Sequence, residues 1–335
     1  MADITKKRVL EMDVIRSLAI VAVIVLHVSA TILYRSKPHS ITYNANFILN
    51  QFSRFSVPAF IIISGMGLTI SYKEGCGYFK FIIRRFLKVV PQYIVWCLLY
   101  IIIITKDFNI HTDLNNIVYG NVFYHFYFVP LIIELYIIFP FIYKFMEKKW
   151  WLLLSFLMTS FFIIYTYYFK VVTPDQWFWN KKNLFYWIFY FSLGGYMGKN
   201  LDNISQKLKK IRPIVCVMFL LSIFTLLYSF ITGNQYGKSI DYITTFQRPS
   251  VIFYSTFFVI FIFSFEWKKG LFMKVIRYIS NTSYDIYLSQ AGILYLYTQY
   301  YIGRYVHLDN LSFGVNAFAV TLIGSIALNE IKKLL

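Results

Sequence analysis

Charged residues are scarce in this chain of 335 residues. They make up 14% of it, whereas soluble domains carry about 25%. Acidic residues are the rarest, since 15 Asp and Glu stand against 33 Lys and Arg for a net charge of +18. Hydrophobic residues make up 58% of the chain and the mean hydropathy is +0.57. These values exclude an array of soluble domains and indicate a membrane protein.

Signatures of metal, disulfide and nucleotide sites are also missing. The three cysteines, at positions 76, 97 and 216, have no CxxC spacing, so we expect neither a disulfide framework nor a thiolate metal site. No Gly-rich phosphate loop or Gly-x-Ser-x-Gly elbow occurs, which disfavours P-loop and α/β-hydrolase folds. The two histidines expected at membrane depth lie in different helices without a third ligand, so no metal is expected.

Long apolar runs are what the sequence does contain. Ten of them are candidates to cross about 30 Å of hydrocarbon. They cover residues 14–34, 47–72, 89–105, 122–143, 150–169, 184–198, 213–232, 249–265, 278–301 and 313–329. No linker or sequence repeat separates them. The sequence therefore predicts an all-α, polytopic membrane protein of about ten transmembrane helices, with residues 1–335 forming a single transmembrane domain.

The distribution of basic residues predicts the orientation. An even number of crossings places both termini on one side, and that side collects 22 Lys and Arg while the other collects 9, among them Arg248. Because cytoplasmic loops carry the excess of basic residues, both termini are predicted to be cytoplasmic. The net charge of +18 is then mainly a topology signal, and a nucleic-acid partner is not expected.

Ionisable side chains at membrane depth are candidate functional residues, because a charge in hydrocarbon is costly. They are Arg16 and His27 in the first span, Arg54 in the second, His125 and Glu134 in the fourth, and Asp285 in the ninth.

Arg16 and His27 share one helix face. Eleven residues make about three helical turns, which leaves an offset of about 20° and a rise of about 16 Å between them. That rise is comparable with an extended pantetheine arm, so a phosphate held near Arg16 would place a thioester near His27. The alternative is that Arg16 reaches lipid phosphates and His27 is a hydrogen-bonded packing residue.

Arg84, Arg85 and Lys88 form a basic cluster where the third span begins, followed by Pro91. Guanidinium groups suit phosphate oxygens, so the cluster predicts a nucleotide or coenzyme A site. The alternative is ordinary cytoplasmic positive charge in contact with anionic lipid.

Glu134 is predicted near mid-membrane, where it would orient an imidazole, pair with an arginine or relay a proton. Arg54 and His125 lie toward the outer side. A salt bridge to Glu134 is the structural alternative for Arg54, and an interfacial hydrogen bond is the alternative for His125. Asp285 is expected to form a cap or an inter-helix hydrogen bond.

Together these residues resemble the acyltransferase 3 family of integral membrane transacylases. Arg16 through His27 is similar to the Arg-x10-His signature, which is the family's most specific mark. The other similarities are Val57 to Phe60 with Ser64 and Gly65, Arg85 to Lys88 with Pro91, and His125 to Tyr136. Two positions depart from the pattern: Lys88 replaces the usual Arg, and Gln290 stands where a late His often follows, which argues against an acid or base role there.

The resemblance implies an O-acyltransferase in a bacterial cell (plasma) membrane. Acyl-CoA would be the cytoplasmic donor, without a metal, and the acceptor would be a hydroxyl of an extracytoplasmic or lipid-linked carbohydrate. The Phe126 to Pro130 segment is similar to family members in intercellular adhesin polysaccharide synthesis, which favours acetyl or succinyl as the transferred group. Membrane lipids and glycan-synthesis proteins are the implied partners.

The resemblance also implies roles for the candidate residues. Arg16, Arg84, Arg85 and Lys88 would hold the coenzyme A phosphates; His27 would be a general base or an acyl carrier; Glu134 would orient His27; and Arg54 and His125 would receive the acceptor. A rival hypothesis is an exporter or flippase of a polysaccharide or its lipid-linked precursor, with the same polar residues lining a path. A structural or sensory subunit is a third, in which Arg16 and His27 would be dispensable.

Overall fold

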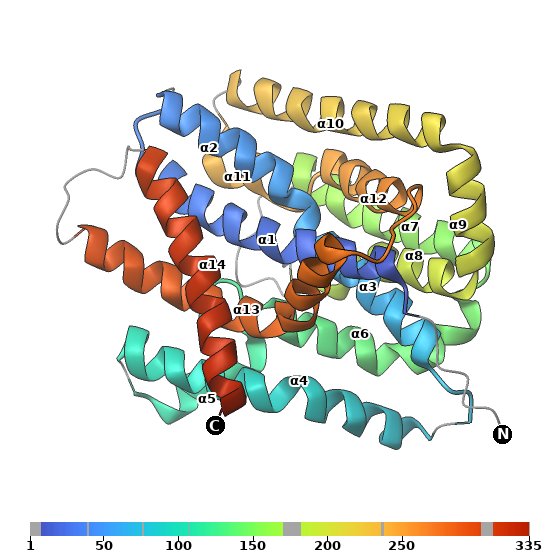
Figure 1. Cartoon of the computed structure of the whole chain (residues 1–335), viewed down its shortest axis with the longest axis horizontal. Coiled ribbons are helices and arrows are strands. Elements are labelled where there is room, and N and C mark those ends of the chain that lie inside the picture. The colour runs from blue at the N-terminus through green and yellow to red at the C-terminus, as the bar shows by residue number, and fades with distance from the viewer. Residues whose placement is uncertain are drawn as a thin grey trace.

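The structure is a computed structural model that describes residues 8–38, 40–75, 77–106, 108–169, 182–235, 238–302 and 311–334. These residues are mostly helical and contain no β-strand, which confirms the all-α prediction. In chain order the elements are α1 (Leu10–Leu33), α2 (Ile41–Phe52), η1 (Ser53–Phe55), α3 (Ser56–Ser71), α4 (Tyr78–Tyr100), η2 (Ile101–Thr105), α5 (Ile110–Tyr119), α6 (Phe128–Ile142), η3 (Tyr143–Phe145), α7 (Lys149–Ile164), η4 (Tyr165–Phe169), η6 (Leu184–Tyr186), α8 (Ile188–Lys199), α9 (Leu201–Lys210), α10 (Arg212–Gln235), α11 (Ile240–Thr244), α12 (Pro249–Phe263), α13 (Leu271–Ile302) and α14 (Leu311–Leu334) (Figure 1).

Eight helical segments of the described residues are long and apolar enough to cross a membrane. They are Leu10–Leu33, Ile41–Ser71, Tyr78–Thr105, Phe128–Phe145, Lys149–Phe169, Arg212–Gly233, Ile240–Phe263 and Ser312–Leu334. Each overlaps one of the ten predicted spans, so the chain is a multi-pass membrane protein. The cytoplasmic placement of the termini stays a prediction.

The two other predicted spans are helical but differ from the eight. Residues 184–198 form η6 and α8, and α8 has 12 residues, which rise only about 18 Å. Residues 278–301 lie within α13, which has 32 residues but carries polar side chains such as Asn281, Asp285 and Gln290. Helices α5 and α9 were not predicted, and α4 begins eleven residues before the predicted third span, so that Arg84, Arg85 and Lys88 lie within it.

Helix α8 is packed in the interior against α3, and glycines make their close approach possible. A Cβ atom at Gly194 of α8 would lie 1.9 Å from the Ile62 carbonyl oxygen of α3, and one at Gly65 would lie 2.2 Å from the Phe191 carbonyl oxygen. Small residues at helix interfaces in membranes allow backbones to approach closely. The Ser64-Gly65 pattern of the second span therefore has a packing role.

We expect Gly194→Ala to destabilise the folded protein by at least ~3 kcal/mol, because the new methyl group meets backbone that cannot rotate away. Gly270→Ala is the control, since a Cβ there has no atom within 4 Å. Fluorescence-detected size-exclusion chromatography in detergent should show loss of the monodisperse peak for Gly194→Ala alone. Equal recovery of both variants would contradict this account of the interface.

The second predicted span is broken where Arg54 lies. Helix α2 ends at Phe52, a 3₁₀ turn covers Ser53–Phe55, and α3 begins at Ser56. Pro58 lacks the N–H that would bond to the Arg54 carbonyl four residues earlier, which favours a break at this point. The break leaves the Arg54 side chain buried in the interior, with 6% of its surface exposed.

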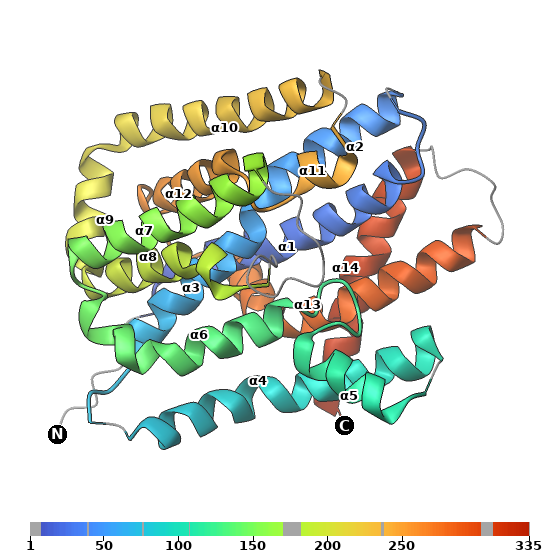
Figure 2. The same cartoon turned by 180° about the vertical axis from the view of Figure 1, so that it is seen from behind.

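Helix α13 bends near its middle in both views (Figures 1 and 2). The Tyr100 hydroxyl of α4 accepts a hydrogen bond from the Gly292 N–H at 2.5 Å and donates to the Leu288 carbonyl at 3.0 Å. It therefore takes the place of the helical bond between residues 292 and 288, an insertion that bends helices. Gln290 lies within this altered turn.

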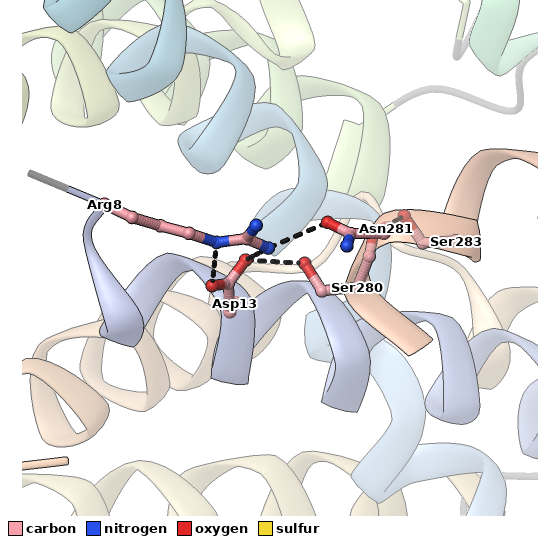
Figure 3. A network of polar contacts seen from close by, with 5 residues as sticks. All are labelled: Arg8, Asp13, Ser280, Asn281 and Ser283. Carbon is pink, nitrogen blue, oxygen red and sulfur yellow. Dashed lines mark hydrogen bonds and ion pairs between the residues drawn. The ribbon is translucent and has the colours of Figure 1, made fainter. Parts of the chain in front are cut away.

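A polar clasp of Arg8, Asp13, Ser280 and Asn281 joins the beginning of α1 to the first half of α13 (Figure 3). Buried Asp13 accepts two hydrogen bonds from Arg8, at 2.5 and 2.7 Å, and one from Ser280 at 2.9 Å. Arg8 also donates to the side-chain oxygen of Asn281 at 2.8 Å. The hydrogen bond to Asp13 raises the pKa of Arg8 above its ordinary value, so this guanidinium stays charged. The clasp fixes the end of α1 that carries Arg16.

Candidate functional site

A cavity of about 500 Å³ lies at the end of α1 that carries His27. Its wall is formed by α1, the α2 to α3 segment, the turns before α6, the α11 to α12 segment and α13. The polar side chains on this wall are His27, Thr31, Tyr34, Asn50, Arg54, Ser56, Tyr124, His125, Tyr127, Asp241, Thr244, Thr245, Gln247 and Tyr287. Three of the candidate residues, His27, Arg54 and His125, are thus brought together, and the volume is that of a small-ligand site.

His27 is half-buried on α1 and held by α13. Its Nδ1 lies 3.0 Å from Oε1 of Gln290. A carbonyl oxygen only accepts hydrogen bonds, so in this arrangement Nδ1 carries the proton and Nε2 carries the free lone pair. The ring also meets Tyr124 edge-on, with centroids 4.9 Å apart. The imidazole is therefore oriented and equipped to act as a base or nucleophile.

His125 is the second imidazole of the cavity. It is 3% exposed, its ring centroid lies 6.1 Å from that of His27, and the Leu288 carbonyl is nearby. The placement of His125 inside the fourth predicted span, residues 122–143, was wrong in one respect: α6 begins at Phe128, and His125 lies in the turns before it. Tyr287 of α13 donates to the His125 carbonyl at 2.5 Å, which holds these turns at the cavity wall.

Arg54 is held by Asn50 and an aromatic ring. Its Nε donates to Asn50 Oδ1 at 3.1 Å, its Nη2 donates to the same oxygen, and the guanidinium lies 4.8 Å from the centroid of Phe246. Asn50 in turn donates to α1, at Ser29 Oγ and the Leu26 carbonyl. Among the described residues Arg54 has no ion-pair partner, so the predicted alternative of a salt bridge to Glu134 is wrong.

The four basic residues predicted to bind the donor phosphates differ in burial. Arg16 of α1 and Arg85 of α4 both lie within electrostatic range of the hydroxyl of Tyr136 on α6. Arg85 is half-buried and donates to Ser71 Oγ at 2.9 Å. Arg84 and Lys88 are exposed. Arg16 and Arg85 are thus the half-buried members of the set, and Arg84 and Lys88 lie on the surface.

Glu134 is half-buried on α6 and does not line the cavity. The side chain that contacts Nδ1 of His27 is Gln290. The expected role of Glu134 in orienting His27 therefore stays a prediction, which no hydrogen bond among the described residues supports. Asp285 pairs with Lys332 of α14 at 2.7 Å, which confirms an inter-helix contact. Cys97 and Cys216 are free thiols in helices, while Cys76 lies outside the described residues.

Sequence reasoning missed three residues of this region. Gln290 was set aside as a departure from the family pattern, and Asn50 was not considered. Arg248 was counted with the outer loops, but it is fully buried, with its Nε donating to the Thr245 carbonyl at 3.2 Å and its Nη2 to Gln51. The available signal was that Asn50 and Gln290 are polar residues inside apolar runs.

Comparison with known proteins gives one family. A family model described as an acyltransferase domain, that of acyltransferase 3, matches residues 9–330. A Staphylococcus aureus protein named for poly-beta-1,6-N-acetyl-D-glucosamine export is 25% identical over 305 residues, covering 86% of this chain and 83% of that protein. A Bacillus subtilis protein named as a membrane-bound acyltransferase is 25% identical over 304 residues, covering 84% and 80%. No solved structure matches the chain.

Proposed function

The chain belongs to the acyltransferase 3 family, and from that premise we propose that it transfers an acyl group from a cytoplasmic acyl-CoA to a hydroxyl of an extracytoplasmic or lipid-linked carbohydrate. Acetyl and succinyl are the proposed acyl groups, and a bacterial cell membrane is the proposed location. The observation that carries this proposal is the His27 imidazole, oriented by Gln290 at the wall of a ligand-sized cavity.

The free Nε2 of His27 supports two routes. As a general base it takes the hydroxyl proton while the hydroxyl oxygen attacks the thioester carbon; the C–S bond breaks, an ester C–O bond forms, and the thiolate sulfur receives a proton to give coenzyme A. As a nucleophile it attacks the thioester carbon first; the C–S bond breaks, and coenzyme A leaves as the thiolate and takes up a proton. The hydroxyl oxygen then attacks the acyl-imidazole; the C–N bond breaks, an ester C–O bond forms, and the hydroxyl proton is released, which balances the proton taken up by the thiolate. Both routes need Nε2 unprotonated, as the contact to Gln290 provides.

Arg16 and Arg85 are the proposed ligands of the donor phosphates. Arg16 lies at the other end of α1, about 16 Å along the helix from His27, and Arg85 of α4 lies within electrostatic range of the same Tyr136 hydroxyl. A pantetheine arm bound there would extend between the helices to the cavity. Arg84 and Lys88, exposed on the neighbouring surface of α4, would add positive potential for an entering nucleotide. No metal has a part in this scheme.

The names of two relatives suggest the acceptor class. The Staphylococcus aureus and Staphylococcus epidermidis proteins are both named for export of poly-beta-1,6-N-acetyl-D-glucosamine. We therefore propose an N-acetylglucosamine-containing glycan as the acceptor, with glycan-synthesis proteins and membrane lipids as partners. The same names support polymer export as the second candidate function.

Mass spectrometry of surface glycans separates transfer from export. Cells with and without the gene are compared for glycan mass and for the amount of polymer on the surface. Transfer predicts that a fixed mass increment of an acyl ester disappears in the deletion while polymer remains outside. Loss of the polymer from the surface without any change in its acylation would overturn the proposed transfer and support export.

Gln290→Leu should lower kcat by about 100-fold, because the imidazole loses the partner that fixes its tautomer and direction. The KM values for donor and acceptor should stay within about twofold, since Gln290 does not line the cavity. Gln299→Leu, on an exposed position of the same helix, is the control. A change in KM with kcat preserved would show that Gln290 does not position His27.

A further inference from the structure

The His27 cavity contains a buried cation whose charge the protein leaves uncompensated. Arg54 lines the cavity, is 6% exposed, and has a neutral amide, Asn50, as its hydrogen-bond acceptor. Within the described part of the chain no carboxylate lies within 4 Å of it. A guanidinium in such a site is costly unless a negative group pairs with it, so a ligand that brings this charge would bind favourably.

A second buried cation adds to the positive potential. Arg248 is fully buried, lies within electrostatic range of Arg54, and donates to the neutral oxygens of Gln51 and Thr245. The acid on the cavity wall is Asp241, and its carboxylate accepts a hydrogen bond from Tyr34. Two guanidinium groups against one carboxylate leave an excess of one positive charge in this region.

The geometry of Arg54 leaves part of its donor fork available. Asn50 occupies Nε and Nη2, and Phe246 covers one face of the guanidinium. Nη1 has no partner among the described residues. Asn50 donates hydrogen bonds to Ser29 and Leu26 of α1, the helix that carries His27. The Arg54 guanidinium is therefore fixed, through Asn50, relative to that helix. It is thus a preorganised donor next to the proposed reaction centre.

We propose that Arg54 binds an oxyanion, a carboxylate or a phosphate, carried by one of the two substrates that meet at His27. This inference rests on the proposed acyl transfer and adds to it a preference for substrates that carry a negative charge. The oxyanion belongs either to a dicarboxylic acyl group or to an acidic acceptor. Its pairing with Arg54 fixes the substrate relative to the imidazole, so the enzyme discriminates between charged and neutral substrates of equal size.

Purified full-length protein in detergent micelles tests the source of the charge. Release of coenzyme A is measured with succinyl-CoA against butyryl-CoA, and with a β-1,6-N-acetylglucosamine oligosaccharide against the same oligosaccharide carrying a terminal phosphate. The wild type should prefer the charged member of one pair by at least about tenfold in kcat/KM. Arg54→Gln should lower kcat/KM for the charged member by at least about tenfold more than for the neutral member, which removes the preference.

Controls keep the result independent of folding and of the overall reaction. Arg35→Gln removes an exposed cation just beyond the end of α1 and should preserve the preference. Succinate or inorganic phosphate should raise the thermal unfolding midpoint of the wild type and of Arg35→Gln but not that of Arg54→Gln, with matched sodium chloride as reference. No preference in either pair, or equal losses for charged and neutral substrates in Arg54→Gln, overturns the oxyanion site. Absence of any coenzyme A release by the wild type overturns the acyl transfer instead, and the anion-dependent midpoints then decide the site alone.

Discussion

Replacing His27 with alanine should lower acyl transfer by about 10³- to 10⁴-fold while leaving the protein inserted and folded. In the proposed mechanism this substitution removes the group that takes the hydroxyl proton or carries the acyl group, which sets the size of the loss. The contact with Gln290 holds the His27 ring and leaves its Nε2 lone pair free for this role. The measurement is transfer of a radiolabelled acyl group from acyl-CoA to glycan in membrane vesicles.

His111→Ala is the matched control, since it removes an exposed histidine on α5. Size-exclusion profiles of both variants should match the wild type. Single-turnover experiments with labelled donor and no acceptor then separate the two routes: label retained on the protein and lost in His27→Ala identifies the acyl carrier, whereas no retained label identifies the general base. Transfer within tenfold of the wild type in His27→Ala would remove His27 from the chemistry.

The spacing of Arg16 and His27 correctly predicted that they lie in one helix. Arg16 and His27 lie in one helix, α1, and their separation follows from helix geometry whatever surrounds them. Apolar runs likewise predicted ten spans, and eight of these overlap helical segments of the described residues that are long and apolar enough to cross a membrane, because the thickness of the hydrocarbon sets their length. These predictions succeeded because each depends on a single segment and on the solvent around it.

Contacts between segments that are far apart in the sequence could not be predicted from helix spacing or apolar runs. Gln290 meets His27 across 263 residues, in a turn of α13 opened by Tyr100 of α4. Neither contact leaves a periodic pattern in the sequence. Arg248 was expected in a loop because a basic residue before an apolar run ordinarily marks a span end. It is indeed the residue that precedes α12, but its side chain is fully buried. For His125 a local signal existed, since Pro130 favours a helix start nearby.

The four basic residues of the predicted donor site differ in burial, so the structure distinguishes among them. Arg16 and Arg85 share the neighbourhood of Tyr136, whereas Arg84 and Lys88 are exposed and would be screened by salt. Contributions to phosphate binding should therefore be graded. We expect Arg16→Gln and Arg85→Gln each to reduce kcat/KM for acyl-CoA by about 30- to 100-fold, the effect of losing a hydrogen bond between charged groups.

A truncated donor makes this prediction specific to phosphate binding. Acetyl-pantetheine carries the same thioester arm without the nucleotide phosphates, so Arg16→Gln and Arg85→Gln should leave its kcat/KM within about threefold of the wild type. Arg84→Gln and Lys88→Gln serve as matched controls and should change kcat/KM for acetyl-CoA by less than about fivefold at 150 mM salt. Equal losses with both donors would place Arg16 and Arg85 in a structural role, and a larger loss in Arg84→Gln would move the phosphate site to the outer surface of α4.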